Sequence, residues 1–227
     1  MSKTDLELAR LLCTRLCHDL AGPISAVAAG AELVGDDPSQ ADEEALALIG
    51  DSSAAASRKL KFMRAALGLA NGPVEDFQGL LDGYLGTVAG MDGKVGVIWP
   101  ELDELSIAEN VLGPTCTQLL LNLCLLGLEI QPGCKKMSLS VSANPLPLTI
   151  EVDVSSNPSS NDSPNNLPAL QESMLRAIED PDIIPVTVKT VQAYVTGKIV
   201  HSLGGTVTCS FLPQSAKVSA SFLEPIP

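Results

Sequence analysis

Apolar residues recur with a helical period in two long segments at the start of the chain. Thr4 and Glu7 form a capping box that opens the first segment, which we expect to run as a helix over 4–34. The second segment predicts a helix over 42–70 that opens with acidic residues. Its seam positions are spaced by three and four residues in alternation, as in a heptad repeat: Leu46, Ile49, Ser53, Ala56, Leu60, Met63 and Leu67.

Two helices joined by a short turn form an antiparallel hairpin, which cannot by itself cover an apolar stripe on both helices. We therefore expect two copies of the chain to pair as a homodimer with a four-helix bundle. After Pro73 the pattern changes to shorter helices and alternating strands. The helices are expected over 74–89, 107–130, 167–178 and 186–203, the strands over 95–99, 137–141, 148–154, 206–212 and 217–223, and a polar loop over 155–166. The sequence thus predicts an α+β protein with two domains, a helical hairpin over 1–72 and an α/β sandwich over 73–227.

Charge is divided unequally between these two domains. The chain has 14 basic and 27 acidic residues, a net charge of −13. Residues 1–72 hold 7 basic and 10 acidic residues (−3), whereas residues 73–227 hold 7 and 17 (−10). This excess of negative charge would repel a phosphate backbone, so we expect no nucleic-acid partner.

The cellular setting follows from features that the sequence lacks. The start of the chain turns acidic at once and has no apolar leader segment. The longest apolar run, 119–128, is about half of the ~20 residues that a membrane span needs. Six cysteines at irregular spacing are typical of reduced, buried thiols, and Cys13 and Cys17 are expected on the apolar side of their helix, which argues against a metal site with His18. We expect a cytoplasmic protein without a membrane span or a bound metal.

His18 is expected on the polar side of the first helix. A helical advance of ~100° per residue gathers the apolar residues on one broad face: Ala9, Leu12, Cys13, Leu16, Leu20, Ile24, Val27, Ala31 and Val34. His18 points roughly opposite to this face, in a row with Leu11, Thr14, Gly22 and Ser25. Gly22 and Ser25 are small and leave room beside the ring, and Pro23 removes a backbone donor one turn after it. Periodicity alone describes an ordinary surface histidine.

The string from Leu16 to Pro23, with His18 followed by Asp19, resembles the phosphoacceptor motif of sensor histidine kinases. The segment 118–123, which contains Asn122, resembles the helix that carries the kinase Asn box. Residues 200–207 resemble the last helix, Gly-Gly turn and strand of the kinase ATP-binding domain. The resemblance spans nearly the whole chain.

At three places the chain departs from the residues that contact the nucleotide in the kinase pattern. Leu126 stands where a second asparagine would ligate magnesium. Residues 153–157 replace the Asp-x-Gly-x-Gly pattern, and residues 185–189 replace the Gly-rich lid. We therefore expect a degenerate ATPase-like domain that binds neither nucleotide nor another cofactor.

This combination is similar to the ChpT-type histidine phosphotransferases, dimeric phosphorelay intermediates with a helical-hairpin bundle and a degenerate ATPase-like domain. The segments 58–60 and 62–68 of the second helix also resemble that family.

The resemblance implies that His18 attacks the phosphoaspartate of a receiver domain, through Nε2 as in the family, and then passes the phosphoryl group to the Asp of a response regulator. An exposed imidazole is largely neutral at cytosolic pH and is therefore a competent nucleophile. Asp19 is expected to accept a hydrogen bond from the ring or to take its proton; the alternative is a solvated helix carboxylate. Receivers bring their own acidic site for Mg²⁺, so we expect none on this chain.

We expect receivers to dock on the His18 face and on a basic cluster of the second helix, Arg58, Lys59, Lys61 and Arg64, unless this cluster is an ordinary solvated face. The docking residues expected are Leu11, Thr14, Arg15, Gly22, Ser25, Arg58, Lys59 and Arg64. His201 is expected to be structural, and Gly204 and Gly205 are expected to end their helix with positive φ.

Two other functions remain open at this point: an ATP-dependent histidine kinase with an unusual nucleotide site, and a dimeric binding module without catalysis. Labelling by Mg-ATP, by a phosphorylated receiver or by neither would distinguish the three functions.

Overall fold

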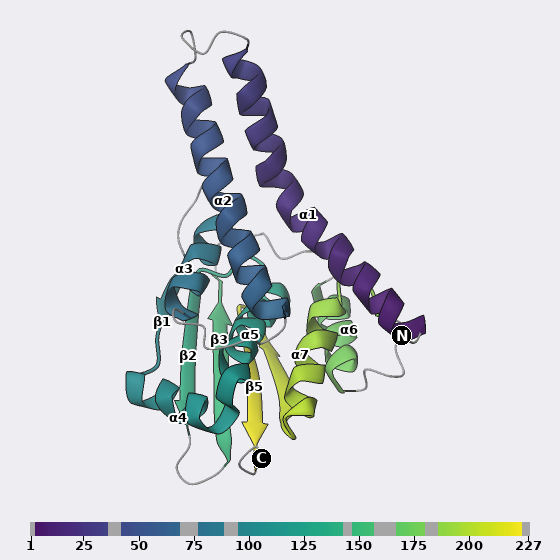
Figure 1. The fold of residues 1–227 in the computed structure, drawn as a ribbon. Helices are drawn as coiled ribbons and strands as arrows, with labels where there is room; N and C mark the ends of the chain where they lie inside the picture. The colour runs from purple at the N-terminus through teal and green to yellow at the C-terminus, as the bar shows by residue number, and fades with distance from the viewer. Residues whose placement is uncertain are drawn as a thin grey trace. The chain divides into compact units, whose positions relative to one another are not determined.

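The computed structural model describes residues 3–35, 42–68, 77–88, 95–142, 147–156, 167–179 and 186–223 (Figure 1). The chain forms two compact units, Met1–Arg64 with Asp76–Gly90 and Ala65–Glu75 with Met91–Pro227. The division expected at residue 72 differs from these units, because the third helix groups with the hairpin and the end of the second helix groups with the sandwich.

The first unit is the expected helical hairpin with one additional helix. Helices α1 (Lys3–Val34) and α2 (Glu43–Leu67) confirm the two long helices predicted from periodicity. Pro23 lies inside α1 without ending it. Helix α3 (Phe77–Val88) buries Leu81, Tyr84 and Leu85, and the Tyr84 ring stacks on Phe62 of α2 at a centroid distance of 4.0 Å. Helix α3 therefore covers part of the apolar surface of α2.

The apolar faces of the hairpin are only half covered. Along α1 the predicted face divides: Leu12, Leu16, Leu20 and Val27 are half-buried, whereas Cys13 and other members are exposed. The exposed members of that face are Ala9, Cys13, Ile24 and Ala31. On the heptad seam of α2, Met63 is buried, but Leu46 and Leu60 expose 53% and 50% of their surface. One chain thus leaves an apolar stripe on each helix without a covering layer.

The second unit is a two-layer sandwich with a five-stranded sheet in the order β1-β2-β3-β5-β4. The strands are β1 (Gly96–Ile98), β2 (Lys136–Ser142), β3 (Leu148–Ser155), β4 (Thr206–Leu212) and β5 (Ser215–Phe222). Strands β1 and β2 are parallel, and the other neighbouring pairs are antiparallel. Side chains of β3 and β5 alternate between a buried and a half-exposed face, so one face of the sheet carries the core.

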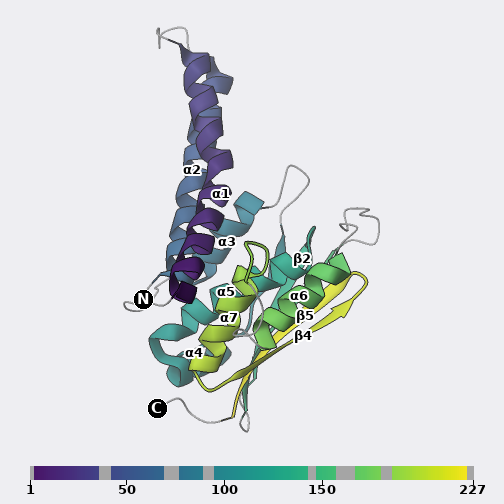
Figure 2. The same cartoon turned by 90° about the vertical axis from the view of Figure 1, so that its right-hand side faces the viewer.

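Helices α5 (Cys116–Ile130), α6 (Leu167–Glu179) and α7 (Val191–Ser202) form the layer that covers this buried face (Figure 2). The central helix α5 is buried along most of its length. The other face of β3 and β5 carries serine, threonine and charged residues, including Lys217, whose Nζ lies 3.1 Å from Oε2 of Glu151.

The prediction of one continuous helix over 107–130 is wrong, because the chain forms two helices there. Helix α4 (Leu102–Leu112) ends at Gly113, which has a φ of 57°, and a short 3₁₀ turn at Gly113–Thr115 precedes α5. Glycine permits this left-handed conformation, and Pro114 lacks the N–H that a continuous helix would use. The stretch Leu102–Ile130 is apolar and long enough to cross a membrane, but most of it is buried within the chain, as in a core helix.

The helix predicted over 186–203 begins later than expected. Helix α7 starts at Val191, and the preceding residues form a turn in which the backbone N–H of Thr187 donates to Oγ1 of Thr190 at 3.0 Å. Of the polar loop predicted over 155–166, residues 157–166 lie outside the described residues.

The Gly-Gly turn after α7 is confirmed in part. Gly204 has a φ of 71°, as expected for a residue that ends a helix. Gly205 does not have a positive φ. A glycine is needed there for lack of space, because a Cβ at this position would overlap the ring of Phe222. The two glycines therefore serve the turn in different ways.

Candidate functional site

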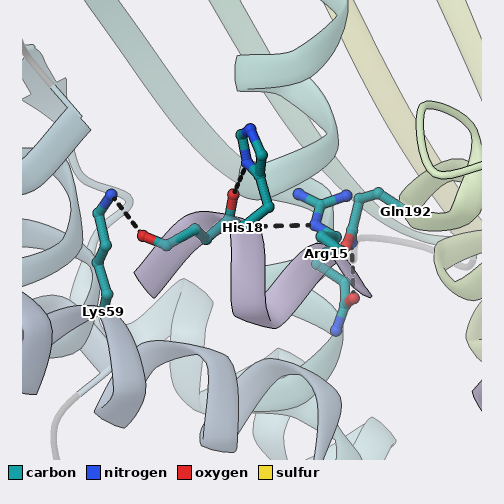
Figure 3. Close-up of polar contacts among 6 residues, drawn as sticks. Arg15, His18, Lys59 and Gln192 are labelled. Carbon is teal, nitrogen blue, oxygen red and sulfur yellow. Dashed lines mark hydrogen bonds and ion pairs between the residues drawn. The ribbon is translucent and has the colours of Figure 1, made fainter. Parts of the chain in front are cut away.

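His18 lies on the exposed side of α1, as the helical period predicts. Its side chain exposes 86% of its surface. Nδ1 of the ring lies 3.4 Å from Oδ1 of Asp19, and the other ring nitrogen points away from this contact (Figure 3). One nitrogen is thus occupied by the protein, while the other is accessible to a reactant.

The Asp19 carboxylate lies between the imidazole and a guanidinium group. Its Oδ2 is 3.7 Å from Nε of Arg15, one helical turn earlier, and its side chain is 25% exposed. The backbone oxygen of Asp19 accepts a hydrogen bond of 3.1 Å from Nζ of Lys59, which connects α1 to α2. The expected contact of Asp19 with the ring is present. A carboxylate at Nδ1 favours the tautomer that carries its proton there and leaves a lone pair on Nε2.

The residues beside the ring are mostly exposed and small. Thr14, Gly22 and Ser25 are exposed, and the Thr14 hydroxyl donates to the backbone oxygen of Arg10 at 2.8 Å. Leu11, one of the expected docking residues, is half-buried and offers a partner less surface than the exposed positions do. A Cβ added at Gly22 would meet nothing within 4 Å. Packing in the described chain therefore does not require a glycine one turn after His18.

The predicted basic cluster divides into free and engaged side chains. Arg58, Lys61 and Arg64 are exposed on α2, and none of them forms an ion pair with another described residue. Lys59 is half-buried and donates to α1. The side chain of Arg15, placed among the docking residues by the sequence, exposes only 10% of its surface and pairs with Asp19.

Asn122, at the position that resembles the kinase Asn box, is fully buried in the second unit. Its Nδ2 donates to the backbone oxygens of Ala66 at 2.6 Å and Gln118 at 2.7 Å. Its Oδ1 accepts from Nε2 of Gln192 at 2.8 Å, and Gln192 also donates to Thr196. Both amide hydrogens and the amide oxygen of Asn122 are therefore used by the protein.

Two other positions that the sequence compared with the kinase pattern, Leu126 and Asp153, have surroundings unlike those of Asn122. Leu126 is fully buried and offers no metal ligand. Asp153 lies on the half-exposed face of β3, where its Oδ2 is 3.6 Å from Nζ of Lys217, whereas its neighbours Val152 and Val154 are buried on the core face. The carboxylate and the Asn122 amide therefore do not converge on one ligand. Among the described residues, no group of three His, Cys, Asp or Glu side chains is arranged to hold a metal ion.

Sequence reasoning missed Gln192 and Thr196, which complete the hydrogen bonds of Asn122. The available signal was their spacing of four residues in the mainly apolar first half of the helix, which places two polar side chains on one buried face. Gln118, named only as part of a motif, donates from Nε2 to the backbone oxygen of Gly68 at 2.8 Å.

The cysteines differ from the expectation of buried thiols at two positions. All six are free; Cys116, Cys124 and Cys134 are buried and Cys209 is half-buried, but Cys13 and Cys17 are exposed. Burial raises the pKa of Cys116 and of Cys209 to about 12, so both thiols stay protonated at neutral pH. The expectation fails for α1 because a single hairpin does not cover that side of the helix.

We expect Asn122→Ala to lower the free energy of unfolding by about 2 kcal/mol or more, because it leaves buried partners of the amide without hydrogen bonds. Urea unfolding followed by circular dichroism measures the change. Asn110→Ala is the matched control: Asn110 is exposed on α4, and its replacement should change stability by less than about 0.5 kcal/mol. Equal stability of the two variants would contradict the structural role of Asn122.

Comparison with known proteins places these features in context. No protein-family model matches the chain. The chain is 46% identical over 65 residues to the protein phosphotransferase ChpT of Brucella abortus (strain 2308), a match that covers 29% of this chain and 30% of that protein. Less than a third of the length of that relative is therefore matched.

Solved structures resemble the chain over a much greater length. A bacterial phosphotransferase solved at 1.7 Å superposes with a TM-score of 0.69 and 25% identity, and the match covers 97% of both chains. The histidine kinase AdeS of Acinetobacter baumannii gives a TM-score of 0.43 at 13% identity, over 91% of this chain and 97% of that one. The predicted α+β fold with a hairpin and an ATPase-like sandwich, and the predicted resemblance to the ChpT-type phosphotransferases, are both confirmed.

Proposed function

We propose that this chain is a histidine phosphotransferase of a phosphorelay. It accepts a phosphoryl group on His18 from the phosphoaspartate of a receiver domain, such as that of a hybrid histidine kinase, and passes the group to the Asp of a response regulator. The observation that carries this proposal is an exposed imidazole whose Nδ1 is held by Asp19 while its other nitrogen is open. The similarity to ChpT of Brucella abortus and to a solved bacterial phosphotransferase supports it.

The chemistry requires little more than a positioned nucleophile. The Nε2 lone pair of His18 attacks phosphorus in line with the bond to the aspartyl oxygen; the N–P bond forms, the P–O bond breaks, and the carboxylate leaves with the electron pair. The Nδ1 proton stays on the ring, where the Asp19 carboxylate stabilises the positive charge that develops. The return step to a second receiver reverses each change.

Receiver docking uses the surface around His18 and the exposed cations of α2. Arg58, Lys61 and Arg64 attract an acidic partner because no described acidic residue neutralises them. The acidic pocket of the receiver holds the Mg²⁺ that assists phosphoryl transfer, so this chain contributes orientation and exclusion of water.

A nucleotide has no part in this reaction. The amide of Asn122 is committed to Ala66, Gln118 and Gln192, and the Asp153 carboxylate pairs with Lys217. We therefore propose that the second unit retains an ATPase-like fold without ATP binding, which separates this chain from an active kinase.

We further propose that the active form is a homodimer in the cytoplasm. Leu6, Cys13, Cys17 and Ile24 are exposed and lie within about 40° of one another around α1. A second copy covers this stripe together with the exposed Leu46 and Leu60 of α2. His18 lies about 120° from the stripe around the helix, so pairing leaves its ring accessible.

His18→Ala should abolish transfer from a phosphorylated receiver without unfolding the chain, because the ring is 86% exposed. We would supply ³²P-labelled Mg-ATP in one reaction and ³²P-labelled receiver domains of the hybrid kinases from the same genome in another. Label is expected only from a receiver, and only on chains that keep His18. His201→Ala is the matched control, because His201 is likewise exposed but lies at the end of a different helix, α7. Label from ATP alone would show a kinase, and label from neither donor would favour a binding module.

Gly22→Ala should stabilise α1 by about 0.5–1 kcal/mol and yet slow transfer from a receiver by roughly 10²-fold, because the added methyl group obstructs the approach to His18. Gly86→Ala is the control, since Gly86 is also helical with nothing within 4 Å of an added Cβ. Phosphoramidate, a small chemical donor, should label His18 equally in both variants. Unimpaired transfer by Gly22→Ala would place the receiver elsewhere.

Cys13 and Cys17 should react with iodoacetamide faster at low protein concentration than at high concentration, because dissociation of the dimer exposes their stripe. Peptide mass spectrometry gives the rates, and light scattering gives the mass of the particle at each concentration. Cys124 is the internal control: it is buried and its pKa is raised, so it should stay unmodified throughout. If the rates of cysteine modification stay the same over the protein concentrations at which the dimer dissociates, this stripe is not the interface.

A further inference from the structure

Arg15 occupies a different environment from the other residues that the sequence assigned to docking. Thr14, Gly22 and Ser25 are exposed, whereas the side chain of Arg15 exposes 10% of its surface. Its Nε lies 3.7 Å from Oδ2 of Asp19, one turn along the same helix. A side chain with so little accessible surface offers a partner few contacts, so its charge acts mainly within the chain.

The two oxygens of the Asp19 carboxylate have different partners. Oδ1 faces Nδ1 of His18 at 3.4 Å, and Oδ2 faces the Arg15 guanidinium (Figure 3). Without a charge at Oδ2, the carboxylate is free to rotate about its terminal torsion, which has a broad energy profile. The Arg15 pair restricts this rotation and keeps one oxygen directed at the imidazole. The bond from Lys59 to the backbone oxygen of Asp19 holds the main chain at the same residue.

We infer that Arg15 is a positioning residue for His18: by holding the Asp19 carboxylate against Nδ1, it fixes the ring proton on Nδ1 and keeps the lone pair on Nε2. The consequence for phosphoryl transfer rests on the proposed function, but the tautomer itself is a property of this chain alone. In the transfer step Arg15 makes no bond to the phosphoryl group and exchanges no proton. It acts only through the carboxylate that faces the ring.

The tautomer is measured directly by ¹⁵N NMR of the chain with labelled histidine. The chain has only two histidines, His18 and His201, and His201→Ala assigns the signals. In the unsubstituted chain we expect His18 to carry its proton on Nδ1. Arg15→Gln should increase the fraction with the proton on Nε2, and Arg15→Lys should restore part of the original state because it returns the charge. Arg10→Gln, at an exposed arginine of the same helix, is the matched control and should change nothing.

An unchanged His18 tautomer in folded Arg15→Gln would overturn the inference. If Arg15→Gln does not fold, Arg15→Met takes its place: it removes the charge but keeps an unbranched apolar stem for packing, and it should shift the tautomer in the same direction. An unchanged tautomer in that variant would overturn the inference equally.

A second readout connects the tautomer to the reaction. Transfer from a phosphorylated receiver should be about tenfold slower in Arg15→Gln, part of the ~10²-fold that a positioned acid–base group contributes, and Arg15→Lys should recover part of the rate. If the unsubstituted chain accepts no phosphoryl group from any receiver, the proposed function fails while the NMR result still decides the role of Arg15. Full transfer activity in Arg15→Gln together with a shifted tautomer would overturn the link between the two.

Discussion

Two helices have too few neighbours to bury the apolar residues that each of them carries, and the first unit is organised around this constraint. Helix α3 covers one side, where Phe62 and Tyr84 stack. The opposite stripe, with Ile24 and Leu60, stays exposed in a single chain. His18 lies on neither of these two faces. Because the large apolar residues lie on these two faces, the surface around the imidazole can remain small, polar and open.

The reactive centre proposed here differs from a buried enzyme site in how it obtains its geometry. His18 is almost fully exposed, so packing does not fix the ring. A carboxylate on the neighbouring residue does so instead, and that carboxylate is held by groups that are themselves largely shielded. Shielding from solvent therefore increases from the His18 ring to the Asp19 carboxylate and on to the Arg15 guanidinium. An exposed nucleophile with a rigid support suits a reaction in which the partner domain supplies the remaining groups.

Periodicity and end signals predicted most elements because long amphipathic helices and alternating strands leave regular patterns. The prediction failed where two residues interrupt a long apolar run: Gly113 and Pro114 divide a helix that hydrophobicity alone makes continuous. The helical period also placed His18 correctly on the exposed side. It did not reveal the burial of Arg15 or the amide contacts of Asn122, because these depend on which residues from distant segments meet. Exposed Cys13 and Cys17 could not be predicted from their apolar neighbours for the same reason.

The hydrogen bonds of Asn122 bear on how such a fold changes over evolutionary time. In this chain the amide ties α5 to the last turn of α2 and to Gln192 on α7. A substitution that frees or removes this amide leaves unpaired polar groups in the core, so a change at Asn122 is tolerated only together with changes at its partners. The amide thus serves the stability of the fold, and selection for a folded protein opposes substitutions that would release it.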